Sequence, residues 1–483
     1  MPQAPERYLN FIGNELRPSD SGETIAVVDP SNGETFANIP RSRASDIARA
    51  VQAARGAFDG AWGRFSAAER SRLLMRLAAL IDTHREELAQ LESRDTGKPL
   101  KQGRADAQAL SRYFEYYAGA ADKLHGQTIP YQAGYTVLTV REPHGVTGHI
   151  IPWNYPMQIF GRSVGASLAV GNACVVKPAE DACLTLIRVA QLGAEAGLPP
   201  GTLNVITGIG AEAGQALAEH PDIDHLSFTG SPDTGRRVAQ AGAQHHCPVT
   251  LELGGKSPQI VFDDADLHAA LPVLVNAIIQ NGGQTCSAGS RVLIQQGIHD
   301  ALMEQLVERF SALRAGPATA DLDLGPLVSR RQLQRVWDYL SDAQASGLQF
   351  AAEGTVHDSA PTAGFYQAPV LLSRVPRDNR LFQEEIFGPV LVTTPFKDER
   401  EALALANGTR YGLVAGVWTR DGGRQLRMAR AIRGGQVFIN NYGAGGGVEL
   451  PFGGVRASGH GREKGFEALY AFTTLKTIAI RHD

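Results

Sequence analysis

Short apolar runs alternate with helical stretches from about residue 145 onward, and this alternation constrains the fold more than any other feature. Strand-like runs lie at 146–151, 173–176, 203–206, 226–228 and 249–251, with helical segments between them. Strands that alternate with helices of this length predict a parallel α/β sheet. Such a sheet binds ligands beyond the carboxyl ends of its strands.

A second alternating region extends from about 258 to 440. Its expected strands are 260–262, 292–294, 390–392 and 436–439, and its expected helices are 299–314 and 331–346. Residues 354–369 are rich in Gly, Pro and Thr and predict a loop. Residues 44–120 are predicted to be helical, with a capping box at Ser66–Glu69.

Composition excludes several classes of protein. Of the 483 residues, 20 % are charged and 43 % are hydrophobic, with a net charge of −4, so neither a basic nucleic-acid surface nor a charged tail is expected. No apolar run approaches the roughly 18–20 residues of a membrane span, and the N-terminus does not resemble a signal peptide. The four cysteines form no C-x-x-C pair, which predicts a reduced, cytoplasmic protein.

Two segments fit neither α/β region. Residues 134–140 and 472–480 alternate like exposed strands. Lone strands with half-apolar faces are seldom stable in water, so we expect the two to pair with each other and then with another subunit. The alternative is that each forms an edge strand of a main sheet.

Cys286 is the strongest candidate for a chemical role. It lies in Asn281-Gly282-Gly283-Gln284-Thr285-Cys286-Ser287, whereas a structural cysteine usually has apolar neighbours. Glu252 lies in a similar glycine-rich segment, Leu251-Glu252-Leu253-Gly254-Gly255. A thiol and a carboxylate in such turns suggest a nucleophile and its base. Cys174 and Cys183 are expected to be buried and inert, and the role of Cys247 is open.

Other motifs are ambiguous when each is taken alone. Asn154, after the strand at 146–151, could donate to an oxyanion, but a turn asparagine is the more common interpretation. Lys177 and Glu180 lie at the end of the next strand, where a carboxylate can accept hydrogen bonds from ribose hydroxyls. The alternative is that the two side chains form a solvated ion pair in a loop. Gly208 to Gly214 has the spacing G-x-G-x-x-x-G, a weak nucleotide signal. Ser231 is expected at a helix N-terminus, which favours phosphate.

Together, and in this order, the motifs resemble those of the aldehyde dehydrogenase superfamily. The resemblance runs from about residue 8 to the end of the chain. The matching residues are Pro152-Trp153-Asn154, Lys177, Glu180, Phe228-Thr229-Gly230-Ser231, Glu252-Leu253-Gly254-Gly255-Lys256, Gly283-Gln284-Thr285-Cys286, Glu385-Ile386-Phe387-Gly388-Pro389, Pro451-Phe452-Gly453-Gly454 and Ser458-Gly459.

The resemblance implies a covalent mechanism. Cys286 would attack the aldehyde carbon, Glu252 would act as general base, and Asn154 with the Cys286 N–H would form the oxyanion hole. A thiohemiacetal would lose hydride, and water would release the acid from the thioester. Glu252 favours hydrolysis over acyl transfer to coenzyme A. The alternatives are a coenzyme A-acylating enzyme and a non-catalytic relative. The presence of Cys286, Glu252 and Asn154 argues against a non-catalytic relative.

The resemblance also implies NAD as cofactor and no metal ion. Lys177 and Glu180 match adenosine-ribose contacts, and Glu180 would repel the 2′-phosphate of NADP, making NADP the less favoured cofactor. Ser231 matches a pyrophosphate contact, while Glu385 and Phe387 match contacts to the nicotinamide ribose and ring. Further expected contacts are Pro152, Trp153, Gly210, Phe228, Gly230 and Leu253.

The implied fold is α/β, with a Rossmann-like cofactor domain, an α/β catalytic domain and a protruding β oligomerisation arm. The cofactor domain would comprise 1–121 and 144–254, and the catalytic domain 255–467. The arm would comprise 122–143 and 468–483 and be shared across a homodimer or homotetramer.

The substrate tunnel is expected to include Tyr155, Arg162 and Phe452. Arg162 resembles the carboxylate-binding arginine of succinic semialdehyde dehydrogenases, and guanidinium suits forked recognition of a carboxylate. Gln280 stands where those relatives place a second arginine, and the small loop Tyr442–Gly447 predicts a wide mouth. The substrate would then be a semialdehyde or an aromatic aldehyde with a distal acidic or polar group. Alternatively, Arg162 pairs with a nearby carboxylate and never meets substrate.

Overall fold

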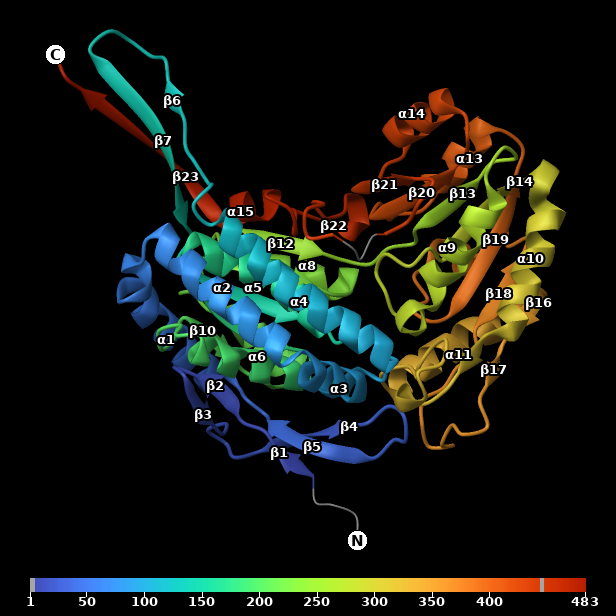
Figure 1. The fold of residues 1–483 in the computed structure, drawn as a ribbon, viewed down its shortest axis with the longest axis horizontal. Coiled ribbons are helices and arrows are strands. Elements are labelled where there is room, and N and C mark those ends of the chain that lie inside the picture. Colours follow the sequence, from blue (N-terminus) through green and yellow to red (C-terminus); the bar gives the residue numbers. More distant parts are fainter. Residues whose placement is uncertain (1–4, 444–446) are drawn as a thin grey trace.

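The computed structural model describes residues 5–443 and 447–483. Two large sheets lie on opposite sides of the molecule, and a narrow β arm projects from the first of them together with the C-terminus (Figure 1). The predicted α/β class is confirmed.

The first sheet has eight strands in the order β22-β12-β11-β8-β9-β10-β2-β3. The five predicted strands are present, and they form its parallel centre. Its strands are β2 (Asn10–Ile12), β3 (Glu15–Arg17), β8 (Val146–Ile151), β9 (Ala173–Pro178), β10 (Leu203–Val205), β11 (His225–Thr229), β12 (Val249–Glu252) and β22 (Gly459–His460). The chain runs outward from β8 to β10 and then returns to place β11 on the other side of β8. This reversal creates a crevice at the carboxyl ends of β8 and β11.

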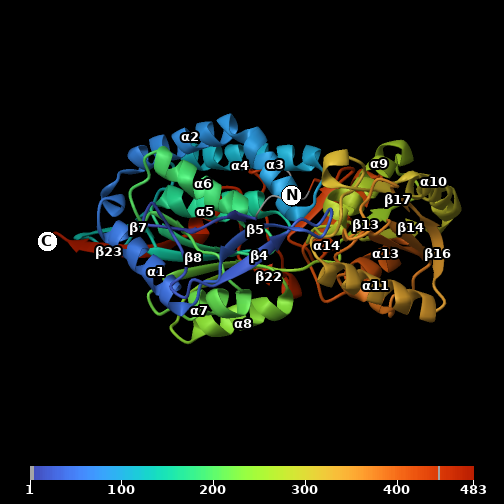
Figure 2. The same ribbon diagram turned by 90° about the horizontal axis from the view of Figure 1, so that it is seen from below.

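Helices cover both faces of the first sheet (Figure 2). The predicted helical segment consists of α1 (Ala44–Asp59), α2 (Ala67–Thr83), α3 (Arg85–Thr96) and α4 (Leu100–Ala120). The capping box is confirmed, because Ser66 N donates to Glu69 Oε2 at 2.7 Å and Glu69 N donates to Ser66 Oγ at 3.3 Å. The buried helix α5 (Pro156–Val170) packs against α2 and α4, while α6 (Leu184–Glu195) packs against α2, α3 and α5. The helix α8 (Pro232–Ala243) covers the opposite face (Figure 2).

The second sheet has seven strands in the order β16-β18-β19-β14-β13-β20-β21. All are parallel except β16. They are β13 (Pro258–Val261), β14 (Arg291–Gln295), β16 (Gln349–Glu353), β18 (Val370–Ser373), β19 (Val390–Phe396), β20 (Val414–Trp418) and β21 (Gln436–Ile439). The predicted helices correspond to α10 (His299–Ala312) and α11 (Arg330–Ala345). The predicted loop at 354–369 contains one short strand, β17 (Thr355–Val356).

The arm consists of β6 (Thr128–Ile129), β7 (Tyr135–Pro143) and β23 (Thr473–Arg481). β7 and β23 pair antiparallel along their whole length, so the predicted pairing is confirmed and the edge-strand alternative is wrong. The arm leaves Leu475 and Ile480 exposed. Elsewhere, β1 (Glu6–Arg7), β4 (Thr24–Val28) and β5 (Thr35–Pro40) form a small sheet. Within residues 5–443 and 447–483, no helix combines the length and the apolar character that crossing a bilayer requires.

Candidate active site

The carboxyl ends of the first sheet's strands meet the amino ends of the second sheet's strands. Asn154 follows β8, and Cys286 precedes β14. The Asn154 Nδ2 amide donates to Gln284 O at 2.9 Å, and the Tyr155 hydroxyl lies 3.1 Å from Thr285 Oγ1. The predicted oxyanion donor is therefore hydrogen-bonded to the turn that carries the predicted nucleophile.

That turn depends on unusual backbone geometry. Asn281, Gly282 and Gly283 have φ values of 50°, 61° and 74°, all in the left-handed region that disfavours most side chains. A Cβ on Gly283 would lie 2.2 Å from Gly388 O, and one on Gly255 would lie 2.3 Å from Cys286 O. The glycines around Cys286 thus allow three chain segments to approach the thiol closely.

The half-buried Cys286 thiol opens into a cavity of about 460 Å³. Asn154 and all three predicted tunnel residues (Tyr155, Arg162 and Phe452) line it. Gln158, in the same segment as Tyr155 and Arg162, lines it too. Polar side chains that sequence reasoning did not assign to the tunnel also line it, namely Gln102, Asp106, Tyr113, Asn276 and Lys464. Gln280 and Tyr442 line the cavity as well, but residues 444–446 of the predicted wide mouth lie outside the described part of the chain.

Arg162 has a carboxylate partner. Its Nε pairs with Glu463 Oε2, and Glu463 Oε1 accepts from Ser227 Oγ at 2.9 Å. The Arg162 guanidinium also lies 4.9 Å from the centroid of the Phe452 ring. Arg162 therefore forms the ion pair considered from the sequence and still contributes to the cavity wall.

Glu252 ends β12 and is only 1 % exposed. Neither carboxyl oxygen has a hydrogen-bond partner among the described residues. A Cβ on Gly453 would lie 2.7 Å from Glu252 Oε1, so a glycine is needed for this side chain to fit. Burial, reinforced by Glu463, raises the pKa of the Glu252 carboxyl well above its usual value. An unsatisfied, buried carboxyl with a perturbed pKa is typical of a functional group.

The thiol is strongly protonated in this environment. Burial raises the pKa of Cys286 to about 12, with Glu385 and Glu252 adding to the rise and Arg162 opposing it. The thiolate is the nucleophilic form, so attack at neutral pH requires a group that removes the proton. Glu252, which influences this pKa, is a candidate for that role.

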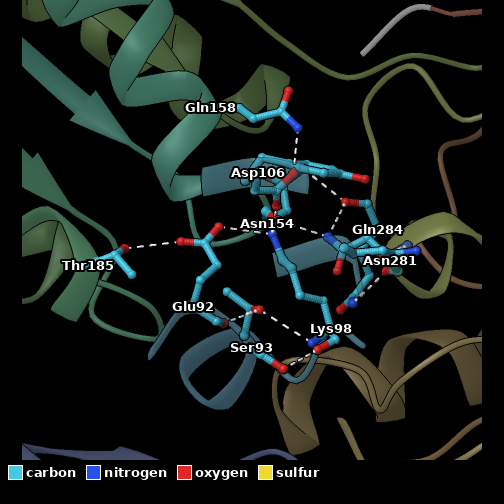
Figure 3. Close-up of polar contacts among 12 residues, drawn as sticks. Glu92, Ser93, Lys98, Asp106, Asn154, Gln158, Thr185, Asn281 and Gln284 are labelled. Atoms are coloured by element: carbon cyan, nitrogen blue, oxygen red, sulfur yellow. Dashed lines mark hydrogen bonds and ion pairs between the residues drawn. The ribbon is translucent and has the colours of Figure 1, made fainter. Parts of the chain in front are cut away.

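A buried charged cluster supports Asn154 from behind (Figure 3). Lys98 Nζ donates to Asn154 O at 3.1 Å and to Glu92 Oε1 at 3.0 Å, and it also pairs with Asp106. Asn281 Nδ2 donates to the same Asn154 oxygen at 2.8 Å. Sequence reasoning missed this cluster, although a lysine between Gly97 and Pro99 at the junction of two helices is a detectable signal.

Replacing Lys98 with methionine should reduce both stability and catalysis. Glu92 and Asp106 would be left buried without their cation, at a cost of about 3–5 kcal/mol. A shift of Asn154 should lower kcat roughly tenfold to a hundredfold, with little change in KM. Thermal melts and steady-state kinetics below the melting range would measure these effects, with Lys101→Met as an exposed control. A destabilised variant with normal kcat would show that Lys98 serves the fold alone.

The candidate cofactor residues of the first sheet gather at its carboxyl edge. Lys177 Nζ pairs with Glu180 Oε2 at 2.9 Å, and Gly210 N donates to Glu180 Oε1 at 3.4 Å. The Lys177 side chain is buried, whereas the Glu180 carboxyl is partly exposed. Ser231 caps α8, accepting from Thr234 N at 3.3 Å, and is exposed. Pro152 and Trp153 follow β8, Phe228 and Gly230 lie at the end of β11, and Leu253 follows β12.

Glu385 and Phe387 approach from the second sheet, in the segment before β19. Glu385 Oε1 accepts from Gly255 N at 2.9 Å, and burial raises the pKa of this carboxyl to about 7. The Phe387 ring lies edge-on to Trp153, with ring centroids 5.4 Å apart. Candidate cofactor residues from both sheets are thus brought together beside the Cys286 turn.

The first sheet is doubly wound, and the crevice at its switch point opens beside the cavity that contains the Cys286 thiol. This is the architecture of an α/β enzyme. The model of the aldehyde dehydrogenase family matches residues 16–478. "Aldehyde dehydrogenase family 2 member B4, mitochondrial" from Arabidopsis thaliana is 43 % identical over 472 residues, covering 97 % of this chain and 87 % of that protein. The chain therefore belongs to the aldehyde dehydrogenase family, whose enzymes are oxidoreductases that act on aldehydes.

Solved structures agree with this assignment. The crystal structure of a putative aldehyde dehydrogenase from Burkholderia cenocepacia has 70 % sequence identity to this chain and a TM-score of 0.98. The match covers 98 % of this chain and 100 % of that chain. The NAD⁺ complex of an aldehyde dehydrogenase from Bacillus cereus is 40 % identical, with a TM-score of 0.96 and coverage of 99 % and 97 %.

Proposed function

We propose that the protein oxidises an aldehyde to the carboxylic acid with NAD through a covalent intermediate on Cys286. The observation that carries the proposal is the convergence of Cys286 and Asn154 on one cavity, with the Glu252 carboxyl close enough to perturb the pKa of the thiol. The NAD⁺ bound to the Bacillus cereus relative supports the choice of cofactor.

The residues at the first sheet's edge fit a dinucleotide. Lys177, Glu180 and Gly210 form a polar cluster in which Glu180 is partly exposed, and the exposed start of α8 at Ser231 suits a phosphate. Glu385 and Phe387 would hold the nicotinamide half. The Glu180 carboxylate favours NAD because it would repel the 2′-phosphate of NADP. When bound, NAD supplies the hydride acceptor.

In the proposed mechanism, Glu252 removes the Cys286 proton, and the thiolate attacks the aldehyde carbon. The side-chain amide of Asn154 carries two N–H donors, one of which is engaged by Gln284 O. The other donor, with the Cys286 N–H, stabilises the oxyanion. Loss of hydride from the thiohemiacetal leaves a thioester. Glu252 then activates a water molecule, which releases the acid and restores the thiol.

Following reduced cofactor over a panel of aldehydes tests this function. We expect NAD reduction without coenzyme A, because the buried Glu252 can activate water. Dependence on coenzyme A would support acyl transfer instead, and the absence of reduction with any aldehyde would support a non-catalytic relative. The panel should include carboxylate-bearing semialdehydes and benzaldehydes.

The assembly belongs to the same proposal. We assign 1–121 and 144–254 to the cofactor domain and 255–467 to the catalytic domain, although β22 from the latter segment extends the first sheet. The arm (122–143 and 468–483) would join subunits of a cytoplasmic homodimer or homotetramer. Its exposed Leu475 and Ile480 suit burial by another subunit.

A further inference from the structure

Tyr442 connects the turn that carries the candidate nucleophile to the end of the second sheet. Cys286 and Ser287 are the two central residues of this turn. Ala288 N donates to Thr285 O at 3.0 Å and closes the turn. The Tyr442 hydroxyl, which lies beyond the end of β21, donates to the backbone oxygen of Ser287. A side chain 155 residues away in the sequence is thus bonded to the residue directly after the thiol.

The ring of Tyr442 is held in place by packing. It lies edge-on to the ring of Phe438 on β21, with ring centroids 5.7 Å apart. Tyr442 and Cys286 both pack against a small apolar cluster formed by Leu413, Val414 and Phe452. Burial raises the pKa of the Tyr442 hydroxyl, so the phenol stays protonated at neutral pH and remains a donor. The side chain therefore presents a fixed hydrogen-bond donor to the turn.

The orientation of Ser287 matters because its backbone N–H bonds to the thiol. Burial raises the pKa of Cys286 to about 12, while Arg162 and the backbone hydrogen bond from Ser287 oppose the rise. A hydrogen bond to the charged form of a group favours that form. The N–H and the carbonyl belong to the same residue, so a partner that fixes the Ser287 carbonyl also restricts the direction of its N–H.

We propose that Tyr442 is a positioning residue, whose hydroxyl holds Ser287 so that the Ser287 N–H stabilises the attacking Cys286 thiolate. The proposal rests on the proposed function and deepens it, because it explains how this turn is kept in its reactive geometry. The other titratable groups that act on the thiol or face the cavity beside it are Arg162 on α5, Glu252 on β12, Tyr155, Glu385 and Lys464.

The first test is alkylation of the thiol in Tyr442→Phe, which loses the hydroxyl and keeps the ring packed against Phe438. Between pH 7 and pH 9, iodoacetamide should label Cys286 about threefold to tenfold more slowly than in the wild type, because part of one charged hydrogen bond is lost. Peptide mass spectrometry would locate the label. Labelling of the other three cysteines, which are buried, should not change, because the effect is local.

Tyr366→Phe is the matched control. The Tyr366 hydroxyl also donates to a backbone oxygen, that of Ser31 at 2.6 Å, and this tyrosine does not line the cavity. This variant should be labelled at the wild-type rate.

The second test follows the first burst of reduced cofactor by rapid mixing with NAD and an aldehyde. Tyr442→Phe should slow the burst by about threefold to tenfold, as in the alkylation test, and leave the dissociation constant for NAD within about twofold of the wild type. Wild-type or faster rates in both tests would overturn the positioning role. Increased labelling of the buried cysteines would also overturn it, because the hydroxyl would then serve the fold as a whole.

Failure of the proposed function would be recognised separately. A wild type that oxidises no aldehyde would refute that function, whereas the alkylation comparison would still show whether Tyr442 controls the reactivity of Cys286.

Discussion

Cys286→Ala should abolish aldehyde oxidation, lowering kcat by about 10⁴-fold or more, because no other cysteine of the described residues lines the cavity. Cys174, Cys183 and Cys247 are all buried, and burial raises the pKa of Cys174 to about 11 and that of Cys247 to about 12. Neither Cys247 nor Cys174 lines the cavity. Steady-state kinetics with the best substrate of the aldehyde panel would measure the loss.

The matched control for this prediction is Cys247→Ala, which removes a thiol outside the cavity and should leave kcat within about twofold of the wild type. NAD binding, measured by calorimetry, should be retained in Cys286→Ala, since no proposed cofactor contact uses the sulfur. Residual oxidation at more than about one per cent of the wild-type rate would contradict covalent catalysis by this residue.

Glu252→Gln should lower kcat by about 10²- to 10⁴-fold, the range expected for loss of a general base. The amide has nearly the same shape as the carboxyl, so the close packing against Gly453 is preserved. Because the Cys286 thiol has a pKa of about 12, its activation slows at neutral pH. Hydrolysis of the thioester slows as well, since no carboxylate activates water. Rapid-mixing kinetics would separate the two steps.

Glu115→Gln, at an exposed carboxylate, is the control for Glu252→Gln and should behave like the wild type. Raising the pH should partly restore the first step in Glu252→Gln, because hydroxide then removes the thiol proton. A variant with unchanged turnover would exclude Glu252 as the base.

The strands around the site could be predicted because their residues are buried on both faces. The apolar runs Ala173–Val176 in β9 and Val292–Ile294 in β14 are continuous, as is typical of buried parallel strands. The N-terminal strands β4 and β5 are half-exposed and less regular, and were not predicted. The strand β20 has the same continuous apolar character as β14, although it is absent from the predicted strands.

The glycine-rich turns revealed the thiol and the carboxyl, because a close approach to reactive groups demands small residues, while Asn154 was found by its place after a predicted strand. The charged partners could not be found in this way. Glu463 pairs with Arg162 across some 300 residues of sequence, and Lys98 becomes buried only when α4 packs against α5. Nothing local distinguishes Lys464 from the neighbouring Arg462. Burial of charge is a property of tertiary packing, and a linear pattern does not encode it.

The central claim is that Cys286 carries the acyl group and Glu252 releases it. Mass spectrometry of Glu252→Gln, quenched after brief incubation with NAD and an aldehyde, tests this claim most directly. The account predicts an increase in mass equal to one acyl group, located on the peptide that contains Cys286, and its absence in Cys286→Ala. An acyl group on another cysteine, or rapid turnover by Glu252→Gln with no adduct on Cys286, would contradict the account.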